Sequence, residues 1–161
     1  MTRLMEDSPW PYIVIDNFLQ DYDFHLSEVN RRKSVGCGAK YRLSISDTSS
    51  FPDIFKYCEK LDHRPYNEVE KVDWYYSVQH GPYEYPIHHE WVKKIISVVV
   101  YLGDEGTGTD LYKPDKSYYG RIDWKPNRAF IFAGKENYTY HSYCAKKGET
   151  RKTLNGFIIS K

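Results

Sequence analysis

The second half of the chain is a series of short segments rich in β-branched and aromatic residues, with turn residues between them and no helical pattern. The segments are residues 72–79, 84–91, 95–102, 118–124, 128–133, 138–143 and 153–160. Clusters such as "HGP", "GDEGTGT" and "KPN" separate them, and glycine, proline and asparagine favour turns. Many short strands with no helices between them are typical of a β-sandwich or a barrel.

The first 71 residues have a different texture. Strand patterns and helical apolar spacing alternate there, with strands predicted at 12–16 and 41–46 and helices at 17–33 and 49–61. A chain of 161 residues is the usual size of one domain. We therefore expect a single domain over 1–161, in which 1–71 forms a helix-and-strand support layer and 72–161 the β-rich body.

Charge is distributed unevenly along a chain that is almost neutral overall. The net charge is +1, but residues 91–161 carry 13 Lys and Arg against 7 Asp and Glu, whereas residues 1–90 carry 10 against 15. The totals do not favour a nucleic-acid or membrane partner. The basic half is consistent with a site for an anionic small molecule, although most of these charges are expected on a solvated surface.

The cysteines and the absence of a long apolar run bear on the cellular location. Cys37, Cys58 and Cys144 are odd in number, far apart and without a CxxC pair, which argues against a disulfide framework and for a reducing compartment. No apolar run reaches about 18 residues, and "MTRLMEDSPWPY" has no signal-peptide core. We expect a cytoplasmic protein with no membrane partner.

Three potential metal ligands stand together in the predicted strand "EYPIHHEW" (84–91). Residues i and i+2 of a strand share a face, so His88 and Glu90 are predicted to point the same way and His89 the opposite way. Two histidines and one carboxylate form the facial triad that binds non-haem Fe(II) and leaves positions open. By itself, however, a His-x-Glu pair is more often an ordinary hydrogen-bonded surface than a metal site.

A third ligand must come from a distant segment. His25 and His63 lie in the part predicted as helical and are expected to be solvated, and His80 lies in a turn. His141 lies in the predicted late strand "YTYHSY" (138–143) and is the natural candidate.

An arginine follows His141 by ten residues. Arg151 opens the last predicted strand, and Thr153 shares its face. A guanidinium binds a carboxylate through paired, charge-assisted hydrogen bonds that a lysine cannot match. A metal with open positions beside such an arginine describes a site for a keto-dicarboxylic acid.

With these residues in place, the sequence resembles the Fe(II)- and 2-oxoglutarate-dependent oxygenases, and within them the small prolyl-4-hydroxylase-like proteins of bacteria and phages. That family has His-x-Asp/Glu, then a histidine about fifty residues later, then Arg-x-Ser/Thr about ten residues further on. The chain has His88-x-Glu90, His141 51 residues after Glu90, and Arg151-x-Thr153. Its "KIISVVVYL", "GTGTDLY" and "KPNRAFIFAG" are similar to the family's apolar strand, glycine–threonine turn and aromatic strand.

The resemblance implies a fold, a reaction and a set of site residues. The fold is mainly β with N-terminal helices, a double-stranded β-helix or cupin-like jelly roll. Fe(II) would be bound by His88, Glu90 and His141, and 2-oxoglutarate would chelate the metal and pair with Arg151, with a hydrogen bond from Thr153. Such a dioxygenase uses O₂, releases succinate and CO₂, and hydroxylates a peptidyl (prolyl-type) or small-molecule substrate, with ascorbate in support. The location would be the host cytoplasm if a phage encodes the protein.

Glu90 departs from the commoner aspartate of the family. Glutamate is one methylene longer, so the metal would lie farther from its strand, or the strand must recede. Some branches of the superfamily use glutamate, and we interpret Glu90 as a variant ligand.

The tyrosine that contacts the cosubstrate is not fixed by the sequence. Many members have a tyrosine shortly before a glycine upstream of the first histidine, whereas Gln79 or His80 stands near that place here. Tyr76, Tyr83 and Tyr85 lie near that place and Tyr101 is another option; of these we assign Tyr76 and Tyr101 to the cosubstrate site.

Two other functions remain open. A nucleic-acid demethylase of the same superfamily would use a basic groove with base-stacking aromatics; the sequence has no clustered Lys/Arg run, so we rank it below a hydroxylase. A non-catalytic jelly-roll binding module would contain the same histidines but bind no Fe(II).

Overall fold

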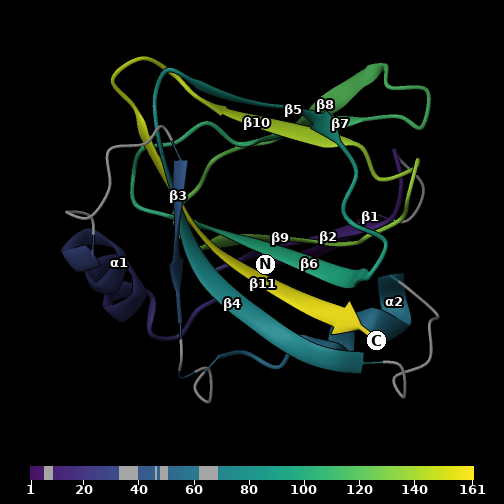
Figure 1. The fold of residues 1–161 in the computed structure, drawn as a ribbon, viewed down its shortest axis with the longest axis horizontal. Helices are drawn as coiled ribbons and strands as arrows, with labels where there is room; N and C mark the ends of the chain where they lie inside the picture. Colours follow the sequence, from purple (N-terminus) through teal and green to yellow (C-terminus); the bar gives the residue numbers. More distant parts are fainter. Residues whose placement is uncertain (6–8, 33–39, 46, 48–50, 62–68) are drawn as a thin grey trace.

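Two antiparallel β-sheets stand face to face in the computed structural model of the chain (Figure 1). The larger sheet has seven strands, in the order β1 (Thr2–Met5), β2 (Tyr12–Asp16), β9 (Arg128–Ala133), β6 (Lys94–Leu102), β11 (Thr150–Ser160), β4 (Val69–His80) and β3 (Lys40–Ser44). The smaller sheet has the order β5 (Tyr83–His88), β10 (His141–Ala145), β7 (Thr109–Tyr112) and β8 (Tyr118–Ile122). The structure describes residues 1–5, 9–32, 40–45, 47, 51–61 and 69–161. This mainly β, jelly-roll architecture is the fold class predicted from the sequence.

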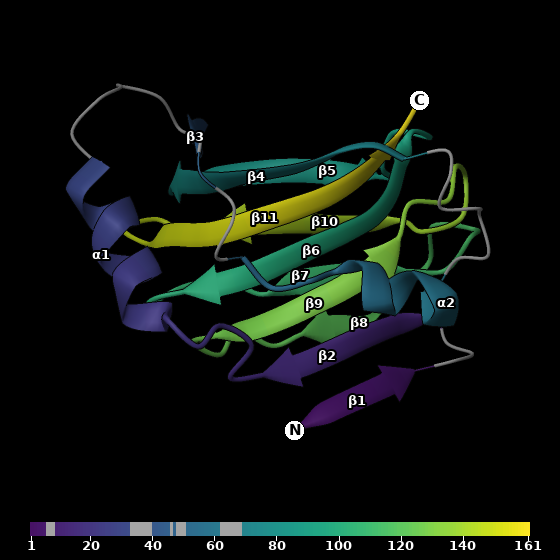
Figure 2. The same cartoon turned by 90° about the horizontal axis from the view of Figure 1, so that it is seen from below.

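The helices cover the outer face of the larger sheet (Figure 2). They are α1 (Tyr22–Arg31) and α2 (Cys58–Leu61), the latter preceded by the 3₁₀ turn η2 (Phe55–Tyr57). Val29 of α1 and Leu61 of α2 are buried in one cluster with residues of the sheet. The predicted helix at 17–33 begins later, because Asn17 has a left-handed φ of 55°. The predicted helix at 49–61, whose first residues lie outside the described part, is reduced to η2 and α2, with Asp53 accepting a hydrogen bond from Phe55 N at 2.9 Å.

Strand alternation gives the larger sheet two different faces. On β6, Ile96, Val98 and Val100 belong to the cluster under the helices, whereas Tyr101 belongs to a second cluster between the sheets. The near-continuous apolar run of β6 is explained by this burial on both faces. The second cluster fills the side near β2, β8 and β9; its buried members are Trp10, Tyr12, Tyr101, Leu111, Ile122, Phe130 and Phe132.

The first 71 residues contribute more than a layer packed outside the body. Strands β1, β2 and β3 all join the larger sheet, with β1 and β3 as its two edges. The sequence did not predict β1, nor β7, which was interpreted as a turn. Among the described residues, no helix is both long enough and apolar enough to cross a bilayer.

Candidate metal centre

The two histidines proposed as metal ligands are direct neighbours across two strands. His88 ends β5 and His141 begins β10, and the two residues are paired in the register of the smaller sheet. Their ring centroids are 4.2 Å apart. Together with Glu90 they offer ligand atoms that all lie within 4.8 Å of one another. The structure therefore brings together the three residues that the sequence singled out.

Glu90 reaches this position from a loop and not from the strand that was predicted to carry it. β5 ends at His88, and the chain turns at once, with Lys94 N donating to Trp91 O at 2.8 Å. Gly134 lets the segment after β9 lie against this turn, because a Cβ there would be 2.1 Å from Lys94 O. The shared face of His88 and Glu90 is thus produced by the turn, not by strand alternation.

Hydrogen bonds to backbone carbonyls orient both imidazoles. His88 Nδ1 lies 2.9 Å from Pro86 O, and His141 Nδ1 lies 3.0 Å from Thr139 O. Because a carbonyl oxygen can only accept, each Nδ1 carries a proton, which leaves each Nε2 as the ring nitrogen that can bind a metal. The same arrangement fixes histidines that bind metals in proteins.

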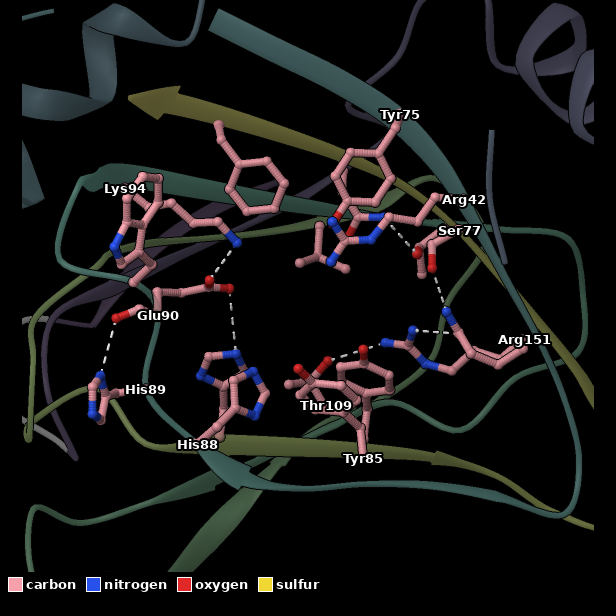
Figure 3. Close-up of a pocket in the computed structure, with 18 residues that line it drawn as sticks. Arg42, Tyr75, Ser77, Tyr85, His88, His89, Glu90, Lys94, Thr109 and Arg151 are labelled. Atoms are coloured by element: carbon pink, nitrogen blue, oxygen red, sulfur yellow. Dashed lines mark hydrogen bonds and ion pairs between the residues drawn. The ribbon is translucent and has the colours of Figure 1, made fainter. Parts of the chain in front are cut away.

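The Nε2 atom of His141 faces a carboxylate oxygen. His141 Nε2 is 3.7 Å from Glu90 Oε1, too far for a hydrogen bond. The other oxygen, Glu90 Oε2, accepts from Lys94 Nζ at 2.6 Å (Figure 3). One carboxylate oxygen is therefore held by an ammonium group, while the other points at the His141 ring. A metal ion could be bound by this set of converging ligand atoms.

The ionisation states also suit a metal ion. Burial, and after it the neighbouring His141, lower the pKa of His88 to about 4. Burial opposes ionisation of Glu90, but His141 and Lys94 outweigh it and lower the pKa of Glu90 to about 2. At neutral pH His88 is a neutral imidazole and Glu90 is a carboxylate, and these are the forms that bind metals.

The donor set fits Fe(II) better than a structural zinc ion. Structural zinc sites are closed by four protein ligands, usually with sulfur among them. Among the described residues, the cluster holds two imidazoles and one carboxylate and no fourth ligand side chain. Two histidines and one carboxylate with open positions match the facial triad of non-haem iron.

Arg151 lies in the same pocket and is almost fully buried, with 2% of its surface exposed (Figure 3). Its Nε donates to Thr107 O at 3.0 Å, and its two terminal nitrogens approach Gln79 Oε1 at 3.1 Å and Thr109 Oγ1 at 3.5 Å. Its guanidinium also lies 4.5 Å from the centre of the Tyr143 ring. No carboxylate among the described residues forms an ion pair with it, so this buried cation is oriented by neutral groups and lacks an anion.

Prolyl hydroxylases are among the solved structures that are similar to this chain. A Pseudomonas putida prolyl-4-hydroxylase superposes with a TM-score of 0.67 at 14% identity, covering 93% of this chain and 92% of that one. A Trichoplax adhaerens prolyl hydroxylase in complex with a hypoxia-inducible-factor peptide gives 0.62 at 13% identity, covering 92% and 83%. A viral collagen prolyl hydroxylase from Paramecium bursaria Chlorella virus-1, in its 2-oxoglutarate complex, gives 0.61 at 13%, covering 93% and 96%. No family model matches the sequence, and no curated protein matches it by sequence.

The chain has the prolyl-4-hydroxylase fold. At these identities the likeness concerns the fold, which is the one that the sequence motifs predicted. His88 and His141 lie between the two sheets of the jelly roll, which is where such a fold can hold a cavity. The position of the triad is therefore compatible with a ligand site.

Within this fold, Thr153 lies where the sequence predicted and the two tyrosines do not line the pocket. Thr153 lines it together with Arg151, and its hydroxyl accepts from Asn155 Nδ2 at 2.9 Å. Tyr101 is fully buried behind the lining, and its hydroxyl donates to Thr109 Oγ1 at 2.8 Å. It therefore supports the groups that orient Arg151, with the Arg151 guanidinium 5.7 Å from its ring centre.

Tyr76 was predicted to contact the cosubstrate, but it does not line the pocket. It lies on the outer face of β4, in the cluster under the helices, with its hydroxyl 2.8 Å from His25 Nδ1. Alternation along β4 explains the error, since Tyr75, Ser77 and Gln79 take the inner face. His25 is corrected as well, because it is buried with only 1% exposed, and His63 lies outside the described residues.

Sequence reasoning missed the residues that hold the ligands and Arg151 in place. Gln79 and Thr109 contact Arg151, and Lys94 contacts Glu90. Ser77 and Gln79 form a polar pair on the inner face of β4, in the buried second half of the strand. Polar residues at alternate positions of a buried strand were the available signal for this part of the site.

Proposed function

We propose that the chain is an Fe(II)- and 2-oxoglutarate-dependent dioxygenase that hydroxylates a peptidyl (prolyl-type) or small-molecule substrate. One observation carries the proposal. Two oriented imidazoles and a carboxylate converge within 4.8 Å, in a pocket whose other end holds a buried arginine with no acidic partner among the described residues. One end of the pocket requires a cation and the other an anion.

His88, Glu90 and His141 would hold the metal, and Arg151 would hold the far carboxylate of 2-oxoglutarate. The metal, together with 2-oxoglutarate and O₂, would supply the oxidising chemistry of the reaction. The chain's own part is to position these groups. Lys94 keeps Glu90 Oε2 engaged, so that Glu90 presents only Oε1 to the metal. Gln79, Thr107 and Thr109 fix the plane of the Arg151 guanidinium before any ligand binds.

Aromatic rings line the space between the two ends. Tyr85 and Tyr143 stack with ring centroids 5.0 Å apart and an interplanar angle of 5°, next to His88. Such rings exclude water from the reacting groups and strengthen the ion pairing of Arg151 with a carboxylate. The Trichoplax enzyme with this fold is known in complex with a peptide fragment, which supports a peptide among the candidate substrates here.

The proposal is tested by turnover. Protein supplied with Fe(II), 2-oxoglutarate and ascorbate should release succinate in the presence of O₂, with a panel of peptides, amino acids and modified nucleic acids as substrates. His88→Ala should abolish this release. Protein that takes up neither Fe(II) nor Mn(II) would instead be a non-catalytic jelly-roll module, and stimulation by single-stranded nucleic acid alone would favour a demethylase.

A further inference from the structure

Three cationic side chains line the pocket, and two of them are accounted for by the proposed function. Lys94 is paired with Glu90 at 2.6 Å. Arg151 is hydrogen-bonded by neutral groups and would bind the cosubstrate. Arg42 is the third, and no carboxylate among the described residues forms an ion pair or a hydrogen bond with it.

Arg42 is held at the edge of the pocket by an aromatic ring. It lies on the edge strand β3, paired in register with Ser77 of β4, so its side chain shares the inner face of the sheet. Its guanidinium carbon is 4.6 Å from the centre of the Tyr75 ring. Figure 3 shows Arg42 beside Tyr75, on the side of the pocket across from His88 and Tyr85. Stacking on a ring leaves the N–H groups at the guanidinium edge free to bind an anion.

The wall beside Arg42 is aromatic and leads toward the metal site. Tyr75 stacks on Phe157 with ring centroids 5.6 Å apart and an interplanar angle of 24°. Lys94, which contacts Glu90, lies 3.8 Å from the centre of the Phe157 ring. The stacked pair of Tyr85 and Tyr143 also lines this pocket. A flat or apolar group fits between rings of this kind, with one end near the metal ligands and the other near Arg42.

The charge of the pocket favours an acid at that end. A divalent metal and the dianionic cosubstrate offset each other, and Glu90 offsets Lys94, so Arg151 already leaves the loaded pocket positive before Arg42 is counted. An anionic substrate group would neutralise this charge, whereas a cationic group would be repelled.

We propose that Arg42, stacked on Tyr75, binds a carboxylate of the substrate, so that the group to be hydroxylated is presented next to an acidic group. This inference rests on the proposed function and names its substrate class as carboxylate-bearing molecules. The carboxylate can belong to a free acid or to an acidic residue of a peptide, because the same guanidinium recognises both.

The test compares probes that differ only in charge. One arm uses 3-phenylpropionate and N-acetylproline with their amides; the other uses short prolyl peptides with either glutamate or glutamine beside the proline. Binding to anaerobic protein loaded with Fe(II) and 2-oxoglutarate is followed by the shift of the metal–cosubstrate visible band, which requires no turnover. In at least one arm, the acid should bind at least about tenfold more tightly than its neutral partner, as expected for charge-assisted hydrogen bonds.

Two arginine variants separate the pocket from general surface charge. Arg42→Gln should reduce the acid preference to near unity, and Arg42→Lys should restore only part of it, because lysine lacks the planar fork. Arg3→Gln is the matched control, since Arg3 is an exposed arginine on β1, the opposite edge strand of the same sheet, and it should change nothing.

The outcomes distinguish this inference from the proposed function. A normal visible band combined with equal binding of acids and neutral partners, or with no binding in either arm, would overturn the Arg42 subsite and leave the oxygenase proposal standing. An acid preference that survives in Arg42→Gln would overturn it as well. Absence of the band from wild-type protein would contradict both.

Discussion

The two ends of the pocket differ in the charge of the ligand that each could bind. At one end, the ligand atoms of His88, Glu90 and His141 converge and could hold a cation. At the other end, Arg151 is a buried cation oriented by three neutral acceptors and without a carboxylate partner among the described residues. The chain has thus fixed the geometry of both ends and left their charges to be balanced by ligands, as expected of a preorganised binding site.

A buried histidine on the other face of the larger sheet provides a contrast to this pocket. His25 is buried under the helices, with Nδ1 hydrogen-bonded to the Tyr76 hydroxyl at 2.8 Å. Its Nε2 lies 3.3 Å from Asp21 Oδ1, close enough for attraction although not in hydrogen-bond geometry. Burial alone therefore does not mark a metal ligand. At His88 and His141, each Nδ1 is hydrogen-bonded to a backbone carbonyl oxygen, and the ligand atoms of both rings lie together with that of Glu90.

The largest effect is expected from breaking the metal end. Because partners that only orient a ligand contribute about 10–100-fold to metal affinity, losing a ligand itself in His141→Ala should weaken Mn(II) binding by more than about 100-fold. Calorimetric titration of the purified protein measures this. The matched control is His89→Ala, because the His89 ring packs near Tyr140 at 5.6 Å and is not in the ligand cluster. Equal affinities of the two variants would remove His141 from the site.

The second effect is expected at the arginine end. Hydrogen bonds to charged groups contribute about 1.5–3 kcal/mol, so Arg151→Ala should raise the 2-oxoglutarate concentration needed for half-saturation by roughly tenfold or more. Lys152→Ala is the control one residue along β11, and it should leave that concentration unchanged. Similar shifts in both variants would show that Arg151 has no special role. Melting temperatures of both variants guard against a folding defect.

A third prediction concerns His25, the buried histidine that is hydrogen-bonded to Tyr76. Burial lowers its pKa, with Asp21 acting in the opposite direction. Because the unfolded chain then binds the proton more readily, this histidine contributes stability that is present above its unfolded pKa of about 6.5 and lost as the pH falls below it. The melting temperature of wild-type protein should therefore drop more between pH 7.5 and pH 5.5 than that of His25→Gln. A parallel drop would mean that His25 is not held neutral by the fold.

The smallest expected effect on 2-oxoglutarate binding comes from comparing Tyr101 with Tyr76, the two tyrosines that were predicted to contact the cosubstrate. Tyr101 donates to Thr109 behind Arg151, and one neutral hydrogen bond contributes about 0.5–1.5 kcal/mol, so Tyr101→Phe should weaken 2-oxoglutarate binding only a few-fold. Tyr76→Phe acts on the outer face and should lower stability without changing 2-oxoglutarate affinity. A larger effect of Tyr76→Phe on that affinity would contradict the placement of Tyr76.

The parts of the site predictable from the sequence were those that motif spacing encodes. His88, Glu90, His141 and Arg151 were named from their order and separation, and the short strands of the second half predicted a β-sandwich or a barrel. The strand at 128–133 was placed with its observed bounds, because a continuous apolar run and the flanking turns agree there. These features depend on local pattern, which a single sequence carries.

The remaining features depend on tertiary contacts. Glu90 was assigned to a strand, yet the close approach of Gly134 and the turn at Lys94 place it in a loop. Tyr76 was assigned to the pocket because the phase of β4 relative to the two sheets was unknown. Arg42 was not identified at all, since its strand joins the pocket wall only through pairing with β4.

The most direct test of the account is an anaerobic titration of the wild-type protein with Fe(II) and 2-oxoglutarate, followed in the visible spectrum. We predict the weak charge-transfer band of a metal–cosubstrate chelate, saturating at one iron and one 2-oxoglutarate per chain, and lost in both His88→Ala and His141→Ala. A protein that binds neither component, or a band that persists unchanged in those variants, would contradict the claim that the pocket is built for a cation at one end and an anion at the other.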